Sequence, residues 1–261
     1  MRTSHVPLIC AWLLGLCVAA MALVGRAQPV ATDQALRGTI RVLEIRGTIT
    51  PALVPQMRKV LEDIDPNRLP AGALLLLDSS GGDGLAAMEM GRIARAAGVH
   101  AFVVGHCNSA CVFILAGAVV RGVANDQAVA IHRGRITVTA SGANVSTASN
   151  PEAALALEVA DHLSEEYLRE MNLPETLFKA MMAVPANLSR FLTLAEMADL
   201  HLTGSDPVWS HAHVPAGAAA YGISPEEFER RMQRVPASCI PGKPTPQEFT
   251  RCYRRIMQAG A

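Results

Sequence analysis

Aromatic residues are scarce in this 261-residue chain, because tryptophan, tyrosine and phenylalanine together make up 4% of it. Neither sign of charge dominates, since 23 lysine and arginine residues balance 23 aspartate and glutamate residues. A chain without a basic stripe lacks the electrostatic footprint of a nucleic-acid-binding protein. We therefore exclude nucleic acid as a partner. Half of the residues are hydrophobic, which is ample for a buried core.

Long hydrophobic runs are lacking except near the N-terminus. Arg2 precedes the almost uncharged apolar run 6–24, and residues 25–27 place small side chains where an export peptidase reads them. We predict that residues 1–27 are a signal peptide cleaved before Gln28, and that the mature chain is periplasmic or secreted. The alternative is an uncleaved membrane anchor through residues 6–24, with the folded part outside the cytoplasm.

Cysteine is also rare, and two of the six cysteines lie in the export segment. The other four, Cys107, Cys111, Cys239 and Cys252, can form two disulfides in an oxidising compartment. Local pairing is the simplest arrangement, because a helical turn between Cys107 and Cys111 would bring them close. We predict the disulfides Cys107–Cys111 and Cys239–Cys252.

Short apolar runs alternate with helical patterns along most of the mature chain. This alternation is typical of βαβ units and predicts an α/β fold with a mostly parallel sheet. The Ser/Thr/Gly/Asn-rich stretch 134–150 is consistent with either a loop or a hairpin. We predict strands at 40–49, 73–77, 101–104, 119–123 and 128–131, and helices at 51–63, 85–97, 109–118, 151–171, from 174 and from 193.

The pattern changes after residue 205. Two capping boxes with proline at the first helical position, Ser224-Pro-Glu-Glu227 and Thr245-Pro-Gln-Glu248, each predict a short helix. The stretch between them, with Pro236 and Cys239, is expected to be a Pro/Gly linker. We therefore divide the mature chain into a main domain, residues 28–205, and a small helical appendage, residues 206–261.

Three segments that follow predicted strands contain the candidate catalytic residues. The carboxyl ends of parallel strands gather at one edge of a sheet, where ligands bind. Gly81-Gly82 lets backbone N–H groups approach a substrate. Ser109, in the first turn of a helix, has its oxygen and the Ala110 N–H at the positive end of the helix dipole. His132 on a neighbouring strand supplies a base, which completes the groups needed for acyl transfer.

In this order and spacing, the segments resemble the Clp protease proteolytic subunit and its relatives in the crotonase-like superfamily. The resemblance runs from about Ile40 to Gly204. It implies a ββα superhelix with a backbone oxyanion hole at the Gly81-Gly82 turn, in which Gly82 is the likelier donor. The family nucleophile follows a glycine by four residues, as Ser109 follows Gly105, so Ala110 would supply the second oxyanion N–H.

The resemblance also implies roles for later segments. His132 matches the family's base on the next buried strand. The long helix from Pro151 resembles the segment that these proteases use for assembly, which implies a homo-oligomer. The stretch from Arg190 resembles the family sequence that follows its acidic triad member. The chain departs from the family here, because Ser189 stands at the position of the aspartate, with Asn187 nearby.

This departure matters because neither Ser189 nor Asn187 stabilises an imidazolium as a carboxylate does. Three outcomes are open: Ser189 or Asn187 orients the histidine weakly, a carboxylate comes from elsewhere, or the enzyme is slow or inactive. The family's proline before the two glycines is also replaced, by Ser80.

Each candidate residue also has a simpler interpretation. Ser109 could be only a helix cap and His132 only a core histidine. A thiol nucleophile at Cys107 or Cys111 is disfavoured, because an oxidising compartment would oxidise both. We expect no metal and no cofactor, because the histidines and cysteines lack the spacing of a zinc site. The histidines considered as ligands are His106, His211 and His213.

The leading hypothesis from sequence is an exported serine hydrolase, most simply a peptidase, which acts on short or unfolded peptides alone or with a membrane-associated partner. The first alternative is a catalytically inactive relative that binds a peptide or a protein partner in the same cleft. A third is acyl-thioester chemistry at the same oxyanion turn without a serine nucleophile. A serine-reactive probe separates the first hypothesis from the other two.

Overall fold

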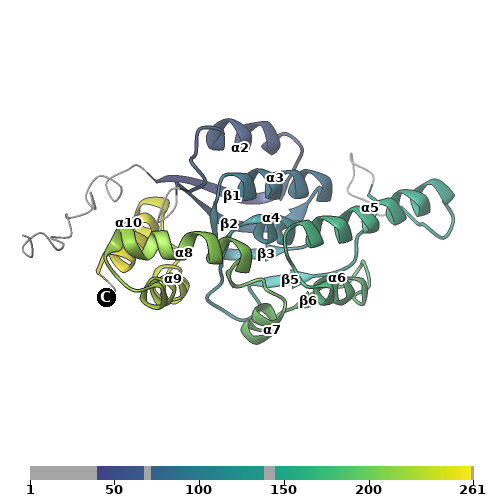
Figure 1. The fold of residues 1–261 in the computed structure, drawn as a ribbon. Coiled ribbons are helices and arrows are strands. Elements are labelled where there is room, and N and C mark those ends of the chain that lie inside the picture. The colour runs from purple at the N-terminus through teal and green to yellow at the C-terminus, as the bar shows by residue number, and fades with distance from the viewer. Residues whose placement is uncertain (1–39, 68–71, 138–144, 260–261) are drawn as a thin grey trace, which may run out of the picture.

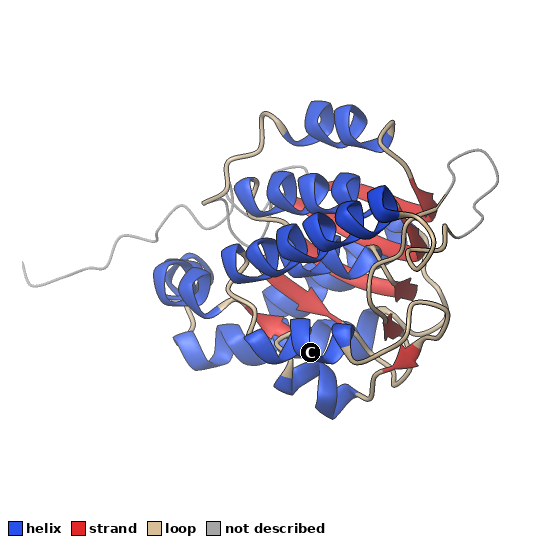
Figure 2. Cartoon of the chain, turned by 90° about the vertical axis from the view of Figure 1, so that its right-hand side faces the viewer, coloured by secondary structure: helices blue, strands red, loops and turns tan. Residues whose placement is uncertain are grey.

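The computed structural model describes residues 40–67, 72–137 and 145–259. The molecule is a mixed α/β protein in which one sheet carries helices on both faces (Figures 1 and 2). The predicted signal peptide, residues 1–27, lies outside the described residues. Within the described ranges, no helix combines the length and apolar character needed to cross a membrane.

Three long parallel strands lie side by side in the sheet, with the first at its edge: β1 (Arg41–Ile49), β2 (Ala73–Gly82) and β3 (His100–Asn108). Two short strands, β4 (Val120–Gly122) and β5 (Val129–Ile131), both run parallel to β3. The first pairs with the beginning of β3 and the second with its end. The predicted mostly parallel sheet is confirmed, and two-residue antiparallel strands complete it: β6 (Arg190–Phe191) and β7 (Gly204–Ser205).

Both faces of the sheet are buried, which explains the continuous apolar run in β2. Leu75 and Leu77 pack into a core with the helices of one face, whereas Leu74 and Leu76 pack into a second core on the other face. Strands covered on both sides lose the alternation of a half-exposed strand. The first face carries α2 (Leu53–Leu61), α3 (Gly84–Ala96), α4 (Cys111–Gly117), α5 (Pro151–Glu170), α6 (Glu175–Met182) and α7 (Leu194–Asp199).

The prediction that residues 79–82 break the second strand is wrong. β2 continues to Gly82, because Thr48 and Ile49 of β1 pair with the two glycines. A Cβ on Gly82 would overlap the backbone of Ile49, and both glycines have positive φ. The glycines therefore extend the strand with a close backbone approach rather than ending it. The helix that follows begins at Gly84, capped by the Asp83 side chain.

Helices α8 (Pro207–Tyr221), α9 (Pro225–Cys239) and α10 (Pro246–Ala259) cover the second face of the sheet (Figure 1). The predicted linker is wrong, because Pro236 and Cys239 lie within α9, and sequence analysis missed α8. An internal proline costs a helix one hydrogen bond. Burial of an apolar face, including Phe228 and Met232, outweighs that cost. Whether 206–261 is a separate domain stays a prediction.

A buried polar cluster joins the start of α8 to the first face of the sheet. Asp206 caps α8 by accepting the Trp209 N–H at 2.9 Å. Its carboxylate lies 2.8 Å from Arg95 on α3 and 3.7 Å from the fully buried Arg121 on β4. Burial alone would raise the pKa of Asp206, but the hydrogen bonds from Arg95 and Trp209 outweigh it and lower the pKa.

Candidate active site

Ser109 lies in a strained turn between β3 and α4. Its φ of 55° puts a non-glycine residue in the left-handed region, which costs about 1–2 kcal/mol. Its N–H donates to the Ala130 carbonyl of β5 at 2.9 Å, and its carbonyl accepts the Val112 N–H at 3.0 Å. The predicted location in the first helical turn is wrong, because α4 begins at Cys111 with Ala110 as its N-cap. The serine therefore occupies a strand-to-helix elbow.

A disulfide closes this turn. The structure joins Cys107 to Cys111, with their Cα atoms 5.1 Å apart, and Ser109 is the central residue of the loop between them. Both cysteines are fully buried in the core under the first face of the sheet. The second disulfide, Cys239–Cys252, joins α9 to α10 far along the chain from this turn. The first disulfide therefore limits the freedom of the backbone on both sides of the serine.

Gly81 lies directly against the serine turn. A Cβ on Gly81 would lie 2.7 Å from the Ser109 Cβ and 3.1 Å from the Ala110 nitrogen, so only glycine fits. The Gly81 N–H is already engaged, because it donates to the Ser79 hydroxyl at 3.1 Å. Gly82 is exposed, whereas Gly81 is buried. Of the two glycines, Gly82 is the one whose backbone faces solvent beside the turn.

Ala110, directly after Ser109, is the N-cap residue of α4. As the N-cap residue, Ala110 precedes the first intrahelical bonds, in which Val112 and Phe113 donate to the Ser109 and Ala110 carbonyls. Among the described residues, no group accepts the Ala110 N–H. Unpaired N–H groups at a helix start attract negative charge. The geometry thus leaves a free donor next to Ser109.

Glycines also fix the helix that begins after Ser109. α3 and α4 approach so closely that a Cβ on Gly117 would overlap the Gly91 backbone. The Tyr167 hydroxyl of α5 donates to the Phe113 carbonyl at 2.6 Å and crosses the same contact. Close-packed interiors have low compressibility, so helices in such contact move little relative to each other. The start of α3, after Gly82, and the start of α4 therefore keep a fixed separation.

His132 follows β5, directly beyond the strand that bonds to the Ser109 turn. The Ser109 N–H meets Ala130, two residues before His132, so the two candidates end neighbouring strands. No hydrogen bond joins the Ser109 hydroxyl to the His132 ring. The ring Nδ1 instead lies 2.7 Å from the carbonyl oxygen of Arg133. Catalytic hydrogen bonds are often loose before substrate binds.

Ser189 and Asn187 do not orient His132 in this structure. The antiparallel pairing of Ile131 with Arg190 places Ser189 at the next position, across from His132. Both Ser189 and Asn187 are exposed, and neither side chain bonds to the ring. The position that the resemblance assigns to a triad aspartate is therefore beside the histidine, but it holds no charge.

A shallow pocket of about 270 Å³ lies beside this segment, between the residues after His132 and α5. The Arg133 guanidinium and the Asp161 carboxylate form an ion pair across it at 3.3 Å. Burial raises the pKa of Asp161, and Arg133 opposes this rise only partly. The pocket is lined by Arg133, Thr147, Ala154, Leu157, Glu158 and Asp161.

Sequence reasoning missed a second carboxylate near the same edge of the sheet. The Asp78 carboxylate lies 2.8 Å from His106 Nδ1 and 3.3 Å from the Arg46 guanidinium. A Cβ on Gly105 would overlap the Asp78 carboxylate, which explains why a glycine occupies this position. Asp78 directly follows the leucine run of β2, and this position at the end of a buried strand could have identified it from the sequence. Asp78 pairs with His106 and is not the missing partner of His132.

The residues considered as metal ligands have other contacts. His213 stacks on Trp209 and contacts Asn67 at 3.1 Å, and His211 lies in the same helix α8. Cys107 and Cys111 are bonded to each other. Within the described part of the chain, no three His, Cys, Asp or Glu residues are grouped as a metal site would need.

No protein-family model and no curated protein matches this chain. Among solved structures, it is similar to a serine-to-alanine mutant of the 1510-N membrane-bound stomatin-specific protease, with 17% identity and a TM-score of 0.47 over 64% of this chain and 78% of that one. It is also similar to a lysine-to-alanine mutant of that protease in complex with a substrate peptide, with 18% identity and a TM-score of 0.47 over 64% and 74% of the two chains.

Proposed function

We propose that this chain is an exported serine hydrolase that cleaves peptide bonds, with Ser109 as nucleophile and His132 as base. The observation that carries the proposal is the left-handed φ of 55° at Ser109, at an elbow between a strand and a helix. Backbone strain of this kind persists only where the surroundings enforce it, and it is concentrated at functional sites. A serine that served only as a helix cap would not need it, and Ala110, not Ser109, is the N-cap.

The reaction follows from the groups at this elbow. Ser109 Oγ attacks the substrate carbonyl carbon while His132 Nε2 takes the hydroxyl proton. The N–H groups of the exposed Gly82 and of Ala110, which is buried and has no acceptor among the described residues, stabilise the oxyanion. The C–N bond then breaks as His132 gives its proton to the leaving amine. Water, deprotonated by the same ring, hydrolyses the acyl-enzyme and restores Ser109.

Two features support an exported protein with a peptide substrate. Both disulfides belong to an oxidising compartment, which agrees with the predicted signal peptide and with a periplasmic or secreted location. The pocket beside His132 combines the aliphatic side chain of Leu157 with the polar Arg133 and Glu158. Such mixed lining suits a peptide side chain better than an acyl thioester. No cofactor is required, and self-assembly through α5 stays part of the proposal.

The test is labelling by a fluorophosphonate, which reacts with activated serines. Purified oxidised protein is compared with Ser109→Ala and His132→Ala, and with Ser80→Ala as the matched control. Ser80 is an exposed serine of β2 next to the two glycines. We expect the first two variants to abolish labelling and Ser80→Ala to leave it unchanged. Labelling that survives Ser109→Ala would show that the reactive serine is another residue.

The second candidate function is an inactive relative that binds a peptide in the same cleft. The observation that favours it is that, among the residues that the structure describes, no carboxylate contacts His132 and no hydrogen bond joins His132 to Ser109. A folded, correctly oxidised protein that no fluorophosphonate labels would support it. Peptide-library binding to wild type and to Ser109→Ala would then be equal, because the hydroxyl would have no chemical role.

A further inference from the structure

The histidine of a serine–histidine pair needs a partner that fixes which ring nitrogen carries the proton. The nearest such group is the Arg133 carbonyl, whose oxygen lies 2.7 Å from His132 Nδ1. A carbonyl oxygen only accepts, so Nδ1 carries the proton and Nε2 keeps its lone pair. We propose that the Arg133 carbonyl orients His132 as a carboxylate does in other triads, an inference that rests on the proposed function.

The structure holds this carbonyl from two sides. The Arg133 N–H donates to the Val184 carbonyl, just after α6, at 3.0 Å. The Arg133 guanidinium pairs with Asp161 of α5 at 3.3 Å. The next residue, Gly134, packs against α5, because a Cβ at this position would be 3.3 Å from the Asp161 carboxylate. Arg133, whose carbonyl accepts from His132, is therefore held between α5 and the end of α6.

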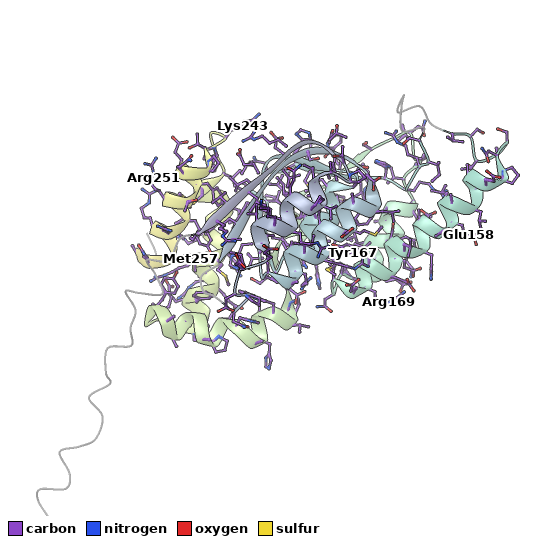
Figure 3. The ribbon with its side chains drawn as sticks, turned by 90° about the horizontal axis from the view of Figure 1, so that it is seen from above. Glu158, Tyr167, Arg169, Lys243, Arg251 and Met257 are labelled. Carbon is purple, nitrogen blue, oxygen red and sulfur yellow. A yellow bond between two sulfur atoms is a disulfide. The ribbon has the colours of Figure 1, made fainter. Side chains whose placement is uncertain are left out.

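Asp161 is the positioning residue in this arrangement. Its side chain is 17% exposed and pairs with Arg133 without touching the histidine. α5 projects from the body at Glu158 and meets the body at Tyr167 (Figure 3). Glu165, one turn after Asp161 on α5, pairs with Arg169 at 3.3 Å and is not among the residues that line the pocket. Glu165 is therefore the matched acidic control, because its loss also removes one ion pair of α5 but leaves Arg133 untouched.

A carbonyl and a carboxylate differ in what they contribute. Either one fixes the tautomer, but only the carboxylate neutralises the imidazolium that forms when Ser109 loses its proton. The arrangement therefore predicts a base in the correct tautomer that is less effective than a full triad. This accounts for an uncharged Ser189 next to His132 without requiring an inactive site.

The first test reads the tautomer directly. Protein labelled with ¹⁵N-histidine is studied by long-range ¹H–¹⁵N NMR at a pH where histidine is neutral, and His132→Ala assigns the resonance. We expect the His132 pattern of a protonated Nδ1 and an unprotonated Nε2. The spectrum is also recorded on Ser109→Ala, so that it does not depend on activity. A ring protonated on Nε2 would overturn the inference and leave the proposed nucleophile untouched.

The second test compares Asp161→Asn with Glu165→Gln. We expect Asp161→Asn to bring in the second tautomer and to slow fluorophosphonate labelling about tenfold, while Glu165→Gln changes neither. If labelling slowed with the tautomer unchanged, Asp161 would be merely structural and its positioning role would be wrong. If wild type carried the expected tautomer but never labelled, the proposed function would fail while the assignment of the ring stood.

Discussion

The disulfide around Ser109 should matter more for activity than for stability, and the second disulfide the reverse. Two double variants are compared: Cys107→Ala/Cys111→Ala, which opens the serine turn, and Cys239→Ala/Cys252→Ala, which opens the C-terminal helices. Both remove one disulfide and two partly or fully buried sulfur atoms. They differ in the length of the loop that is released and in the distance from the candidate site.

Stability and activity should change in opposite order. From sequence separations of 4 and 13, the chain-entropy relation gives about 2 kcal/mol for the first disulfide and about 3 kcal/mol for the second. The left-handed backbone of Ser109 stores about 1–2 kcal/mol, and opening the first loop lets part of it relax. Since 1.4 kcal/mol corresponds to a factor of ten, labelling should slow about tenfold.

The assay pairs urea unfolding with the rate of fluorophosphonate labelling, measured at a temperature where both variants are folded. We expect the C-terminal variant to be the less stable of the two and to label within about twofold of wild type. We expect the variant that lacks Cys107 and Cys111 to be more stable than that variant and to label slowly. Equal labelling of the two variants would refute the idea that the first disulfide enforces the geometry of Ser109.

Three further predictions concern the framework. Complete burial lowers the pKa of His100 from 6.5 to about 3, so between these values the unfolded chain binds a proton that the folded chain does not. The free energy of unfolding should therefore decrease by about 1.4 kcal/mol for each unit by which the pH is lowered in this range. The difference in urea stability between wild type and His100→Gln should shrink from pH 7 to pH 5, and a constant difference would contradict this. Asp206→Asn leaves Arg121 buried without a carboxylate and should cost about 3–5 kcal/mol in thermal or urea unfolding; a loss below 1 kcal/mol would show that the cluster is not coupled. Gly91→Ala places a methyl group against the Tyr167 hydroxyl and should lower the free energy of unfolding by about 1–3 kcal/mol. In the control Gly84→Ala, the new methyl group would be 3.9 Å from its nearest atom, so stability should hardly change. Equal melting temperatures of the two variants would be inconsistent with the packing described.

Periodicity predicted the elements whose pattern is set locally. The strand at 73–77 and the helix from Pro151 both appear, because an uninterrupted leucine run and a proline N-terminus specify them without help from distant residues. The helix predicted from residue 193 also appears, and a capping box formed by Thr193 and Glu196 opens it. These features depend on neighbours within a few residues, so the sequence alone was sufficient.

Features set by distant contacts could not be predicted. Gly81 and Gly82 continue a strand because β1 pairs with them, and glycines otherwise indicate a turn. Pro215 and Pro236 lie inside helices because burial against the sheet offsets the lost bonds. The contact between His132 and Arg133 depends on side-chain rotamers, and no sequence motif encodes it.

The apolar underside of the sheet has a practical consequence for anyone who shortens this chain. Leu74, Leu76 and Phe102 are essentially inaccessible to solvent only because α8, α9 and α10 lie over them. A protein that ended at residue 205 would expose this hydrophobic face of the sheet to water, and large exposed apolar surfaces cause aggregation. Residues 206–259 are therefore a required cover of the sheet, and any shortened protein used to study Ser109 has to include them.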